Sequence, residues 1–164
     1  MTMVILGVDP GTARLGWGVI QDKSGRQTVD SYGCLQTATG NTDAHRLEAL
    51  FKQFVKLLKK FKPDAVAVEN IFFFKNQKTV IQISQVRGVI LLACQQLNLA
   101  SYSYSPLQIK MAVTGFGRAD KNQVAQMTKA ILKLKTIPQP DDTADALAVA
   151  LTHAFSYKLK SRVK

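Results

Sequence analysis

Four acidic residues stand where the sequence would otherwise continue a hydrophobic core. Asp9 and Glu69 each follow a short apolar run, and Asp142 and Asp145 lie three residues apart in PDDTADALAVALTH. A carboxylate removed from water needs a hydrogen-bond donor, a cation or a metal ion. Residues three apart share one face of a helix, so all four carboxylates could meet at the mouth of one sheet. Such a set is suited to hold two hard cations such as Mg²⁺ for phosphate chemistry.

Each acid also has an ordinary structural explanation. Asp9 precedes Pro-Gly and is of a type that forms turns. Asp141 and Asp142 begin a helix, where acids commonly cap the backbone or interact with the helix dipole, and we assign that role to Asp141. Asp145 lies beyond the cap among Ala and Leu, and Glu69 follows AVAV in a strand. The joint pattern therefore favours a functional set over four separate structural residues.

The charge balance points to a polyanionic partner. The 164 residues include 22 Lys and Arg against 11 Asp and Glu, which gives a net charge of +11. This excess is typical of proteins that bind nucleic acid, although it does not say which kind or whether anything is cut. Metal ions at the acidic residues would let a phosphate approach them in spite of their charge.

The apolar pattern changes period along the chain and predicts alternating strands and helices. Alternating or continuous apolar runs indicate strands, and apolar residues at helical spacing indicate helices. A capping-box pattern joins Asp120 and Gln123 at the start of one helix. The expected elements are strands at 3–9, 15–20 and about 28–36, a helix from Asp43 to before Pro63, a strand in DAVAVEN, a helix at 78 to about 97, a strand in ASYSY, a helix after Asp120, and a helix from about Asp141.

This order predicts an α/β protein with a mixed five-stranded sheet and helices on both faces, and it fits a ribonuclease-H-like fold. The first three strands are expected to form an antiparallel meander. The length suits one domain over residues 1–164, with a basic tail at about 158–164. The N-terminus has no signal-peptide features, no apolar stretch approaches a membrane span, and Cys34 and Cys94 have no CxxC spacing. We therefore expect a cytoplasmic protein with no membrane partner and reduced cysteines.

The helix expected at 78–97 is apolar on two sides. One stripe includes Ile90 and Cys94, and another includes Ile81, Val89 and Leu92. A helix that is apolar nearly all round is buried on both sides, either within its own domain or against a partner chain.

Five stretches together resemble the RuvC family of Holliday-junction resolvases, which are ribonuclease-H-like endonucleases. They are ILGVDPGTARLGWGVI, AVENIFFFKN, QVRGV, ADKNQVAQM and PDDTADALAVALTH. They follow the same order and similar spacing from the first strand to the last helix. The resemblance implies a homodimer that nicks two strands of a four-way DNA junction symmetrically and leaves 5′-phosphate and 3′-hydroxyl ends. It also implies two Mg²⁺ ions, with Mn²⁺ as a substitute, and metal-binding catalytic residues at Asp9, Glu69, Asp142 and Asp145.

The resemblance also suggests partner contacts. It makes the helix at 78–97 the dimer contact, and the family works beside a branch-migration motor. In IFFFKN, strand alternation leaves at least one of Phe72, Phe73 and Phe74 exposed. Such a ring either closes an edge strand over the core or forms a wedge that stacks on distorted bases. The resemblance places Phe72 at the junction centre, and the extended run leaves the other two rings as candidates.

Basic residues are the remaining candidates for DNA contact. Lys110 and Lys121 match family lysines implicated in DNA binding and catalysis, and Lys121 falls in the first turn of a helix, where a bound phosphate is favoured. Gly115 and Gly117 allow either a close backbone approach to DNA or simple loop flexibility. The further candidates for phosphate contact are Lys75, Lys78, Arg87 and Arg118. We interpret His45 and His153 as structural.

Three alternatives compete with a junction resolvase. A related ribonuclease-H-like family trims ribosomal RNA precursors and shares the opening aspartate motif, but its middle motifs do not match ENIFFF. The DPGT turn weakly resembles the phosphate loop of actin-like sugar kinases, which need a second large lobe. A junction-binding module without activity is disfavoured by the complete set of acids.

Overall fold

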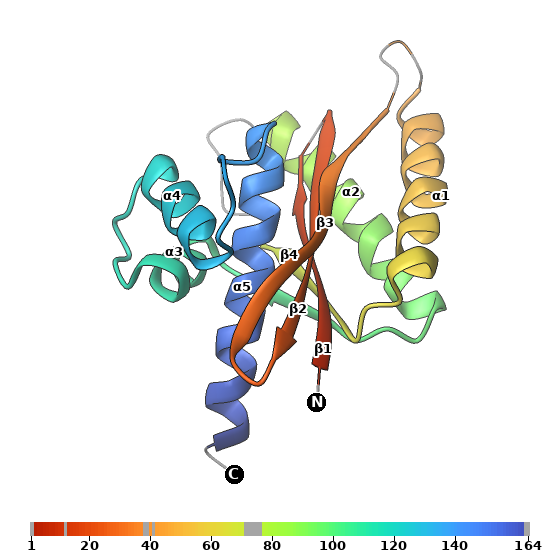
Figure 1. Ribbon diagram of the computed structural model, residues 1–164. Coiled ribbons are helices and arrows are strands. Elements are labelled where there is room, and N and C mark those ends of the chain that lie inside the picture. Colours follow the sequence, from red (N-terminus) through yellow and green to blue (C-terminus); the bar gives the residue numbers. More distant parts are fainter. Residues whose placement is uncertain (1, 12, 38–39, 41, 71–76, 163–164) are drawn as a thin grey trace.

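The computed structural model describes residues 2–11, 13–37, 40, 42–70 and 77–162, without the side chains of residues 77 and 158–162. Within these residues the chain forms one sheet and the helices that cover it (Figure 1). The elements are β1 (Thr2–Pro10), β2 (Arg14–Lys23), β3 (Arg26–Gln36), α1 (Asp43–Phe61), β4 (Ala65–Glu69), α2 (Gln77–Gln96), β5 (Ser101–Tyr104), α3 (Pro106–Thr114), α4 (Lys121–Ile131) and α5 (Asp141–Arg162).

The sheet is mixed, and its strand order is β3-β2-β1-β4-β5. The first three strands form the predicted antiparallel meander, and β4 and β5 extend the sheet in parallel with β1. Val8 of β1 pairs with Val68 of β4, so the next residues, Asp9 and Glu69, end neighbouring parallel strands at the same edge. This topology confirms the predicted mixed five-stranded sheet.

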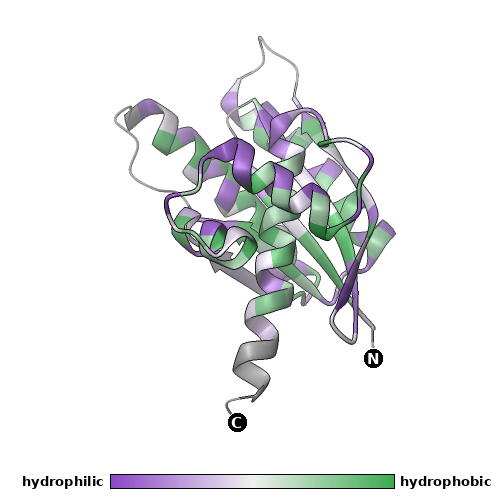
Figure 2. Cartoon of the chain, turned by 60° about the vertical axis from the view of Figure 1, so that its left-hand side comes forward, coloured by the Kyte–Doolittle hydropathy of each residue, from purple (hydrophilic) through white to green (hydrophobic). Residues whose placement is uncertain are grey.

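Helices cover both faces of the sheet. On one face, α1 and α2 pack on residues such as Leu6 and Val66, with Phe54 fully buried between the layers. On the other face, α5 runs along β1 and β2 and buries Leu147 against Ile5, while α3 and α4 pack against α5. Figure 2 shows apolar residues concentrated in the strands and on the inward sides of the helices. The alternating side chains of one sheet thus supply two separate cores.

Glycines let α5 lie directly on the sheet. A side-chain carbon on Gly7 would overlap the carbonyl oxygen of Ala146 and lie 2.6 Å from the backbone nitrogen of Ala150. A side-chain carbon on Gly16 would overlap the carbonyl oxygen of Asp142. The absence of side chains at these two strand positions therefore fixes how closely α5 approaches and brings its first turn to the end of the sheet that carries Asp9.

Replacing Gly7 by Ala is expected to lower the free energy of unfolding by about 1–3 kcal/mol, because the backbone of α5 must move to admit the methyl group. Gly18→Ala is the matched comparison, since its added methyl meets the side chain of Leu147, which can change rotamer. Gly18→Ala should lower the free energy of unfolding by less than Gly7→Ala does. Urea unfolding followed by circular dichroism measures both, and equal stability of Gly7→Ala and the unsubstituted chain would contradict this packing.

The predicted elements are confirmed within a few residues at their ends, including the capping box of α4, where the Gln123 backbone N–H donates to Asp120 Oδ1 at 2.8 Å. The sequence analysis missed α3. Its signal was present as Ser105-Pro106 followed by Gln108, which forms a second capping box with proline in the first turn.

Three other features complete the comparison with the sequence. The IFFFKN candidates Phe72, Phe73, Phe74 and Lys75 lie outside the described residues. Cys94 is buried as expected, whereas Cys34 is only half-buried on β3. In the described part of the chain, no helix has the length and apolar character needed to cross a membrane.

Candidate active site

The sheet and α5 bring the four acids to one end of the molecule. Asp9 and Glu69 arrive on adjacent parallel strands, and Asp142 and Asp145 arrive on the first two turns of α5. The close approach of α5 at Gly16 places the backbone of Asp142 over β2, beside the strand position that pairs with Asp9. The fold thus brings the strand-end and helix acids to one end of the sheet, and their joint role as a catalytic site stays a prediction.

Asp9 and Glu69 interact directly. Burial raises the pKa of Asp9 well above its ordinary value, and the nearby charges of Glu69, Asp145 and Asp142 raise it further. Burial also raises the pKa of Glu69, while its hydrogen bond with Asp9 opposes that increase. Burial and the neighbouring carboxyl groups both disfavour the charged form of Asp9. Like charges are therefore held close together at this edge of the sheet at an electrostatic cost.

Lys121 places a positive charge beside the acids of α5. Its Nζ lies 2.9 Å from Asp145 Oδ2 and 3.5 Å from Asp141 Oδ2. Burial alone would lower the pKa of Lys121, but these two carboxylates raise it. Burial raises the pKa of Asp145, and the ammonium group of Lys121 opposes that rise. Asp141, interpreted from the sequence as a helix-start residue only, also helps to hold this lysine.

The acids suit hard divalent cations. All four side chains offer carboxylate oxygens, the ligands that Mg²⁺ and Mn²⁺ prefer. As they stand, no group of three or more His, Cys, Asp or Glu side chains among the described residues is placed so that it could hold a metal ion. The ammonium of Lys121 pairs with Asp145 instead. The chemistry of the four side chains fits a hard cation, and their positions would have to change to bind one.

A hollow beside these acids is open to a substrate. Its polar lining comes from Glu69, Lys110, Lys121 and Asp145, and its apolar lining includes Ile109 and Val124 of α3 and α4. Two lysines and two acids thus face one space. This combination can admit a phosphate group next to carboxylates, because the lysines attract the anion while the acids hold its counter-ion.

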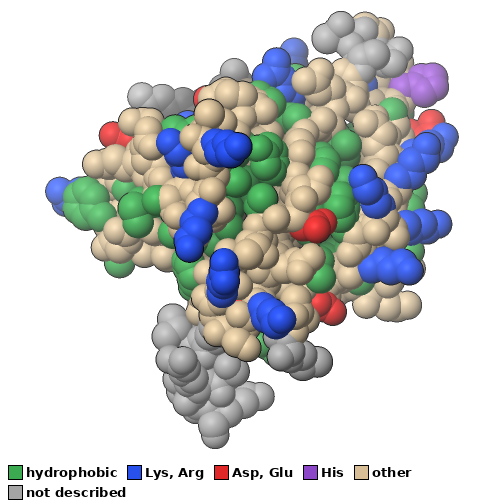
Figure 3. Space-filling view, viewed as in Figure 1, with side chains coloured by type: hydrophobic (Ala, Val, Ile, Leu, Met, Phe, Trp, Pro, Cys, Tyr) green, Lys and Arg blue, Asp and Glu red, His purple; other side chains and the backbone are tan. Residues whose placement is uncertain are grey.

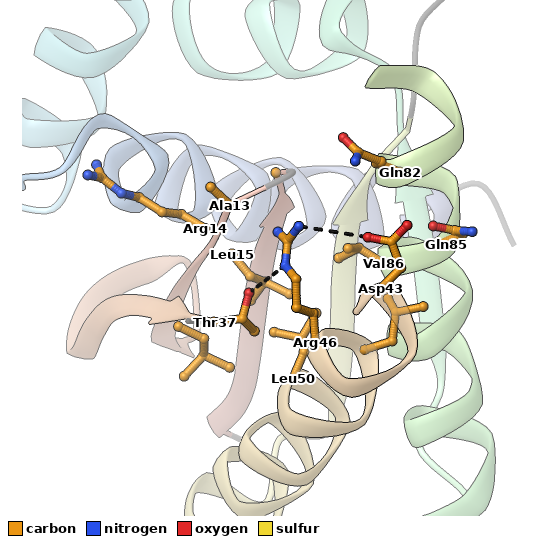
Figure 4. Close-up of a pocket in the computed structure, with 13 residues that line it drawn as sticks. Ala13, Arg14, Leu15, Thr37, Asp43, Arg46, Leu50, Gln82, Gln85 and Val86 are labelled. Carbon is orange, nitrogen blue, oxygen red and sulfur yellow. Dashed lines mark hydrogen bonds and ion pairs between the residues drawn. The ribbon is translucent and has the colours of Figure 1, made fainter. Parts of the chain in front are cut away.

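A second hollow lies on the other face of the sheet, between the β1–β2 turn, α1 and α2 (Figure 4). Arg46 spans it, donating to Thr37 Oγ1 at 3.2 Å and lying 3.9 Å from Asp43. Leu15, Leu50 and other apolar side chains line it, and none of the four site acids does. Its contacts join α1 to the end of β3, which is a structural role.

Comparison with known proteins assigns the family. A family model described as crossover junction endodeoxyribonuclease RuvC matches residues 5–153. The chain is 48% identical over 160 residues to the crossover junction endodeoxyribonuclease RuvC of Halothermothrix orenii, and the match covers 98% of this chain and 97% of that protein. The chain belongs to the RuvC family. It is therefore a crossover junction endodeoxyribonuclease, a Holliday junction resolvase with the ribonuclease-H-like fold, which excludes the competing classes considered from the sequence.

Other RuvC proteins show the same likeness. The RuvC of Fusobacterium nucleatum is 47% identical over 154 residues, covering 94% of this chain and 81% of that protein. Among solved structures, T. thermophilus RuvC in complex with a Holliday junction substrate superposes with a TM-score of 0.92 at 35% identity, covering 97% of each chain. The backbone that positions the four acids is thus the RuvC backbone.

The other candidate site residues of this RuvC chain fall into two groups. Lys110 borders the hollow of the acids, and Arg118 is exposed just before α4. Lys78 is exposed near the start of α2, whereas Arg87 is half-buried and donates to Ser103 Oγ of β5 at 2.7 Å. The Arg87 contact ties α2 to the sheet, and DNA contact by Arg87 and Lys78 stays a prediction.

The remaining sequence interpretations concern glycine and histidine. Gly115 ends α3 in the left-handed conformation, with φ of 72°, and Gly117 packs against Leu107 and Met111 of α3. Packing therefore accounts for Gly117, and close approach to DNA stays a prediction for both glycines. His153 is buried and its Nδ1 lies 2.8 Å from the hydroxyl of Tyr104, in agreement with a structural role.

The raised pKa values predict how stability depends on pH without divalent metal. The folded pKa values of Asp9, Glu69 and Asp145 lie above their ordinary values of about 4. Between the ordinary and the raised values the folded chain binds more protons than the unfolded chain, so its stability falls as pH rises through that window. In EDTA, the melting temperature of Asp9→Asn should exceed that of the unsubstituted chain by an amount that grows as the pH rises.

Added Mg²⁺ provides the complementary measurement. It should raise the melting temperature of the unsubstituted RuvC chain more at pH 8 than at pH 5, since protons compete for the same carboxylates. The same addition should have less effect on Asp9→Asn. Melting curves that stay parallel for the two proteins at every pH would show that Asp9 does not carry the raised pKa.

Proposed function

We propose that this resolvase cuts junction strands by metal-assisted hydrolysis at Asp9, Glu69, Asp142 and Asp145. The observation that supports it is the position of Asp9 and Glu69 at the ends of two adjacent parallel strands, where the charges of Glu69, Asp145 and Asp142 all raise the pKa of Asp9. When bound there, two Mg²⁺ ions, or Mn²⁺ in their place, would activate the attacking water and stabilise the leaving oxygen. The products are a 5′-phosphate and a 3′-hydroxyl.

Lys121 positions the phosphate in this proposal. It lies in the first turn of α4, where backbone N–H groups also favour an anion. Its ammonium group faces the same hollow as Glu69 and Asp145. A cation held by Asp145 would take the place of this ion pair and leave the Lys121 ammonium free to contact a phosphate oxygen. Lys110 borders the hollow from α3 and adds a second positive charge for the incoming strand.

The surface charge suits a DNA substrate. Lys and Arg side chains are spread widely over the face shown in Figure 3, where acidic side chains are few. The chain as a whole carries a net charge of +11. Contacts of this kind bind DNA without reading its sequence and weaken as salt increases. We propose four-way junction DNA as the substrate, with Phe72, Phe73 or Phe74 as the wedge at its centre.

The proposal includes a homodimer formed through α2. Ile81 and Leu92 of this helix are 59% and 53% exposed. They are eleven residues apart, which is about three helical turns, so they lie on one face. Gly88 lies between them, and among the described residues no atom outside its chain neighbours and its own helix backbone lies within 4 Å of where a side-chain carbon would be. A second copy packed on this face would place two active sites for symmetric nicks in two strands, and a branch-migration motor is the further partner proposed.

End-labelled synthetic junctions test the mechanism. A mobile four-way junction in Mg²⁺ should yield paired nicks that DNA ligase can seal directly, because ligation requires the proposed 5′-phosphate and 3′-hydroxyl. A linear duplex of the same sequence and a reaction in EDTA are the controls, and both should remain uncut. Cutting in EDTA, or nicks that ligase cannot seal, would contradict hydrolysis by this site.

A further inference from the structure

The loop between α3 and α4 exposes an aromatic side chain that the proposed mechanism does not use. Phe116 is 55% exposed, and Leu107, Met111 and Met127 of the neighbouring helices are exposed as well. Figure 3 shows hydrophobic side chains gathered over this loop at the left edge of the molecule, with a basic side chain beside them. An exposed apolar cluster on one loop indicates a binding surface more often than chance exposure does.

The loop holds Phe116 in a fixed position. The hydroxyl of Thr114 accepts from the Phe116 backbone N–H at 3.0 Å and donates to the carbonyl oxygen of Lys110 at 2.7 Å. The carbonyl oxygen of Phe116 in turn accepts from the Ala119 N–H at 3.1 Å. Gly117 packs so closely on α3 that a side-chain carbon there would lie 2.8 Å from Leu107 Cδ1. A side chain presented in this way loses little conformational entropy on binding.

Positive charges flank the loop on the side of the active site. Lys110 of α3 and Lys121, the first residue of α4, both line the hollow that holds Glu69 and Asp145. Arg118 is exposed two residues after Phe116. The Thr114 hydroxyl contacts both the Lys110 carbonyl oxygen and the Phe116 backbone N–H, which keeps the backbones of these two residues close. The Phe116 side chain itself lines a different hollow, together with Asn122 and Met127 of α4.

We propose that Phe116 is a DNA-contacting residue that packs against the bases or sugars of the strand entering the active site. This inference rests on the proposed function, because it takes the bound polyanion to be the junction. Cations flanking an apolar ring match the charged backbone and apolar bases of DNA, and Phe and Met are side chains that proteins insert between base steps. The positive charges of Lys110, Arg118 and Lys121 around the loop favour DNA over a protein partner.

Two substitutions at Phe116 test the contact. Phe116→Ala should weaken junction binding about tenfold, the effect expected when an aromatic contact to a base is lost. The slope of log affinity against log salt should stay unchanged, since no charge is removed, whereas Arg118→Ala should lower that slope by about one phosphate contact. Phe116→Trp should bind as the unsubstituted chain does, and its added indole fluorescence should be quenched by the junction.

Tyr157→Trp is the matched control. Tyr157 is also exposed, but it lies twelve residues beyond Asp145 on α5, about 18 Å along the helix. Its indole should not respond to the junction. Full affinity in Phe116→Ala together with an unquenched indole in Phe116→Trp would overturn the inference and leave the patch to a protein partner. Failure of the unsubstituted chain to bind junctions would instead count against the proposed function.

Discussion

Asp9→Asn is expected to reduce junction cleavage by at least about a thousandfold, since a metal ion's contribution to the transition state is several kcal/mol and each 1.36 kcal/mol is a factor of ten. Burial raises the pKa of Asp9, and the nearby charges of Glu69, Asp145 and Asp142 raise it further. Loss of this carboxylate removes a hard oxygen ligand and one negative charge from the centre of the set.

The fold should survive this substitution. An asparagine amide can donate a hydrogen bond to Glu69, and it replaces a carboxyl group whose charged form burial disfavours. Asp9→Asn should therefore be at least as stable as the unsubstituted chain in EDTA and bind junctions within a few-fold. This combination of higher stability and lost activity is the trade-off expected where charges are held together for catalysis.

Single-turnover cleavage of a labelled junction in Mg²⁺ measures the effect. Asp30→Asn is the control, because Asp30 is exposed on β3 and its substitution removes one charge away from the acid set. It should cleave at the unsubstituted rate. Appreciable cleavage by Asp9→Asn would remove this residue from the catalytic set.

Leu92→Glu is expected to convert a dimer into a monomer at micromolar concentration. In an isologous dimer each copy contributes the same face of α2, so the substitution places two negative charges in one apolar contact. Burying an uncompensated charge costs several kcal/mol per ion, which shifts the dissociation constant by at least about a hundredfold. Paired nicking of the two junction strands should be lost with the dimer.

Light scattering at known concentration measures the oligomeric state. Leu107→Glu serves as the control for that measurement, since Leu107 has a similar exposure of 58% but lies on α3. It should remain dimeric. A Leu92→Glu protein that is still dimeric and still nicks both strands would show that α2 does not form the contact.

The sequence by itself determined the local features of this protein. Alternating and helical apolar periods predicted the five strands and four of the five helices in the described part of the chain, because these periods follow from backbone geometry within a few residues. Asp9 and Glu69 could be recognised because a carboxylate at the end of an apolar strand needs a hydrogen-bond donor or a cation. The missed helix, α3, is short, and its capping box was readable in Ser105-Pro106 and Gln108.

Only the tertiary structure decided which of these features meet. Asp142 reaches the end of β1 because Gly7 and Gly16 leave room for α5, and that requirement is invisible in a local pattern. The pairing of Lys121 with Asp145 and the exposure of Phe116 likewise depend on how α3 and α4 pack against α5. These contacts join residues far apart in the chain. Their energies come from close packing and from electrostatic interactions between neighbouring charges, which local secondary-structure propensity does not encode.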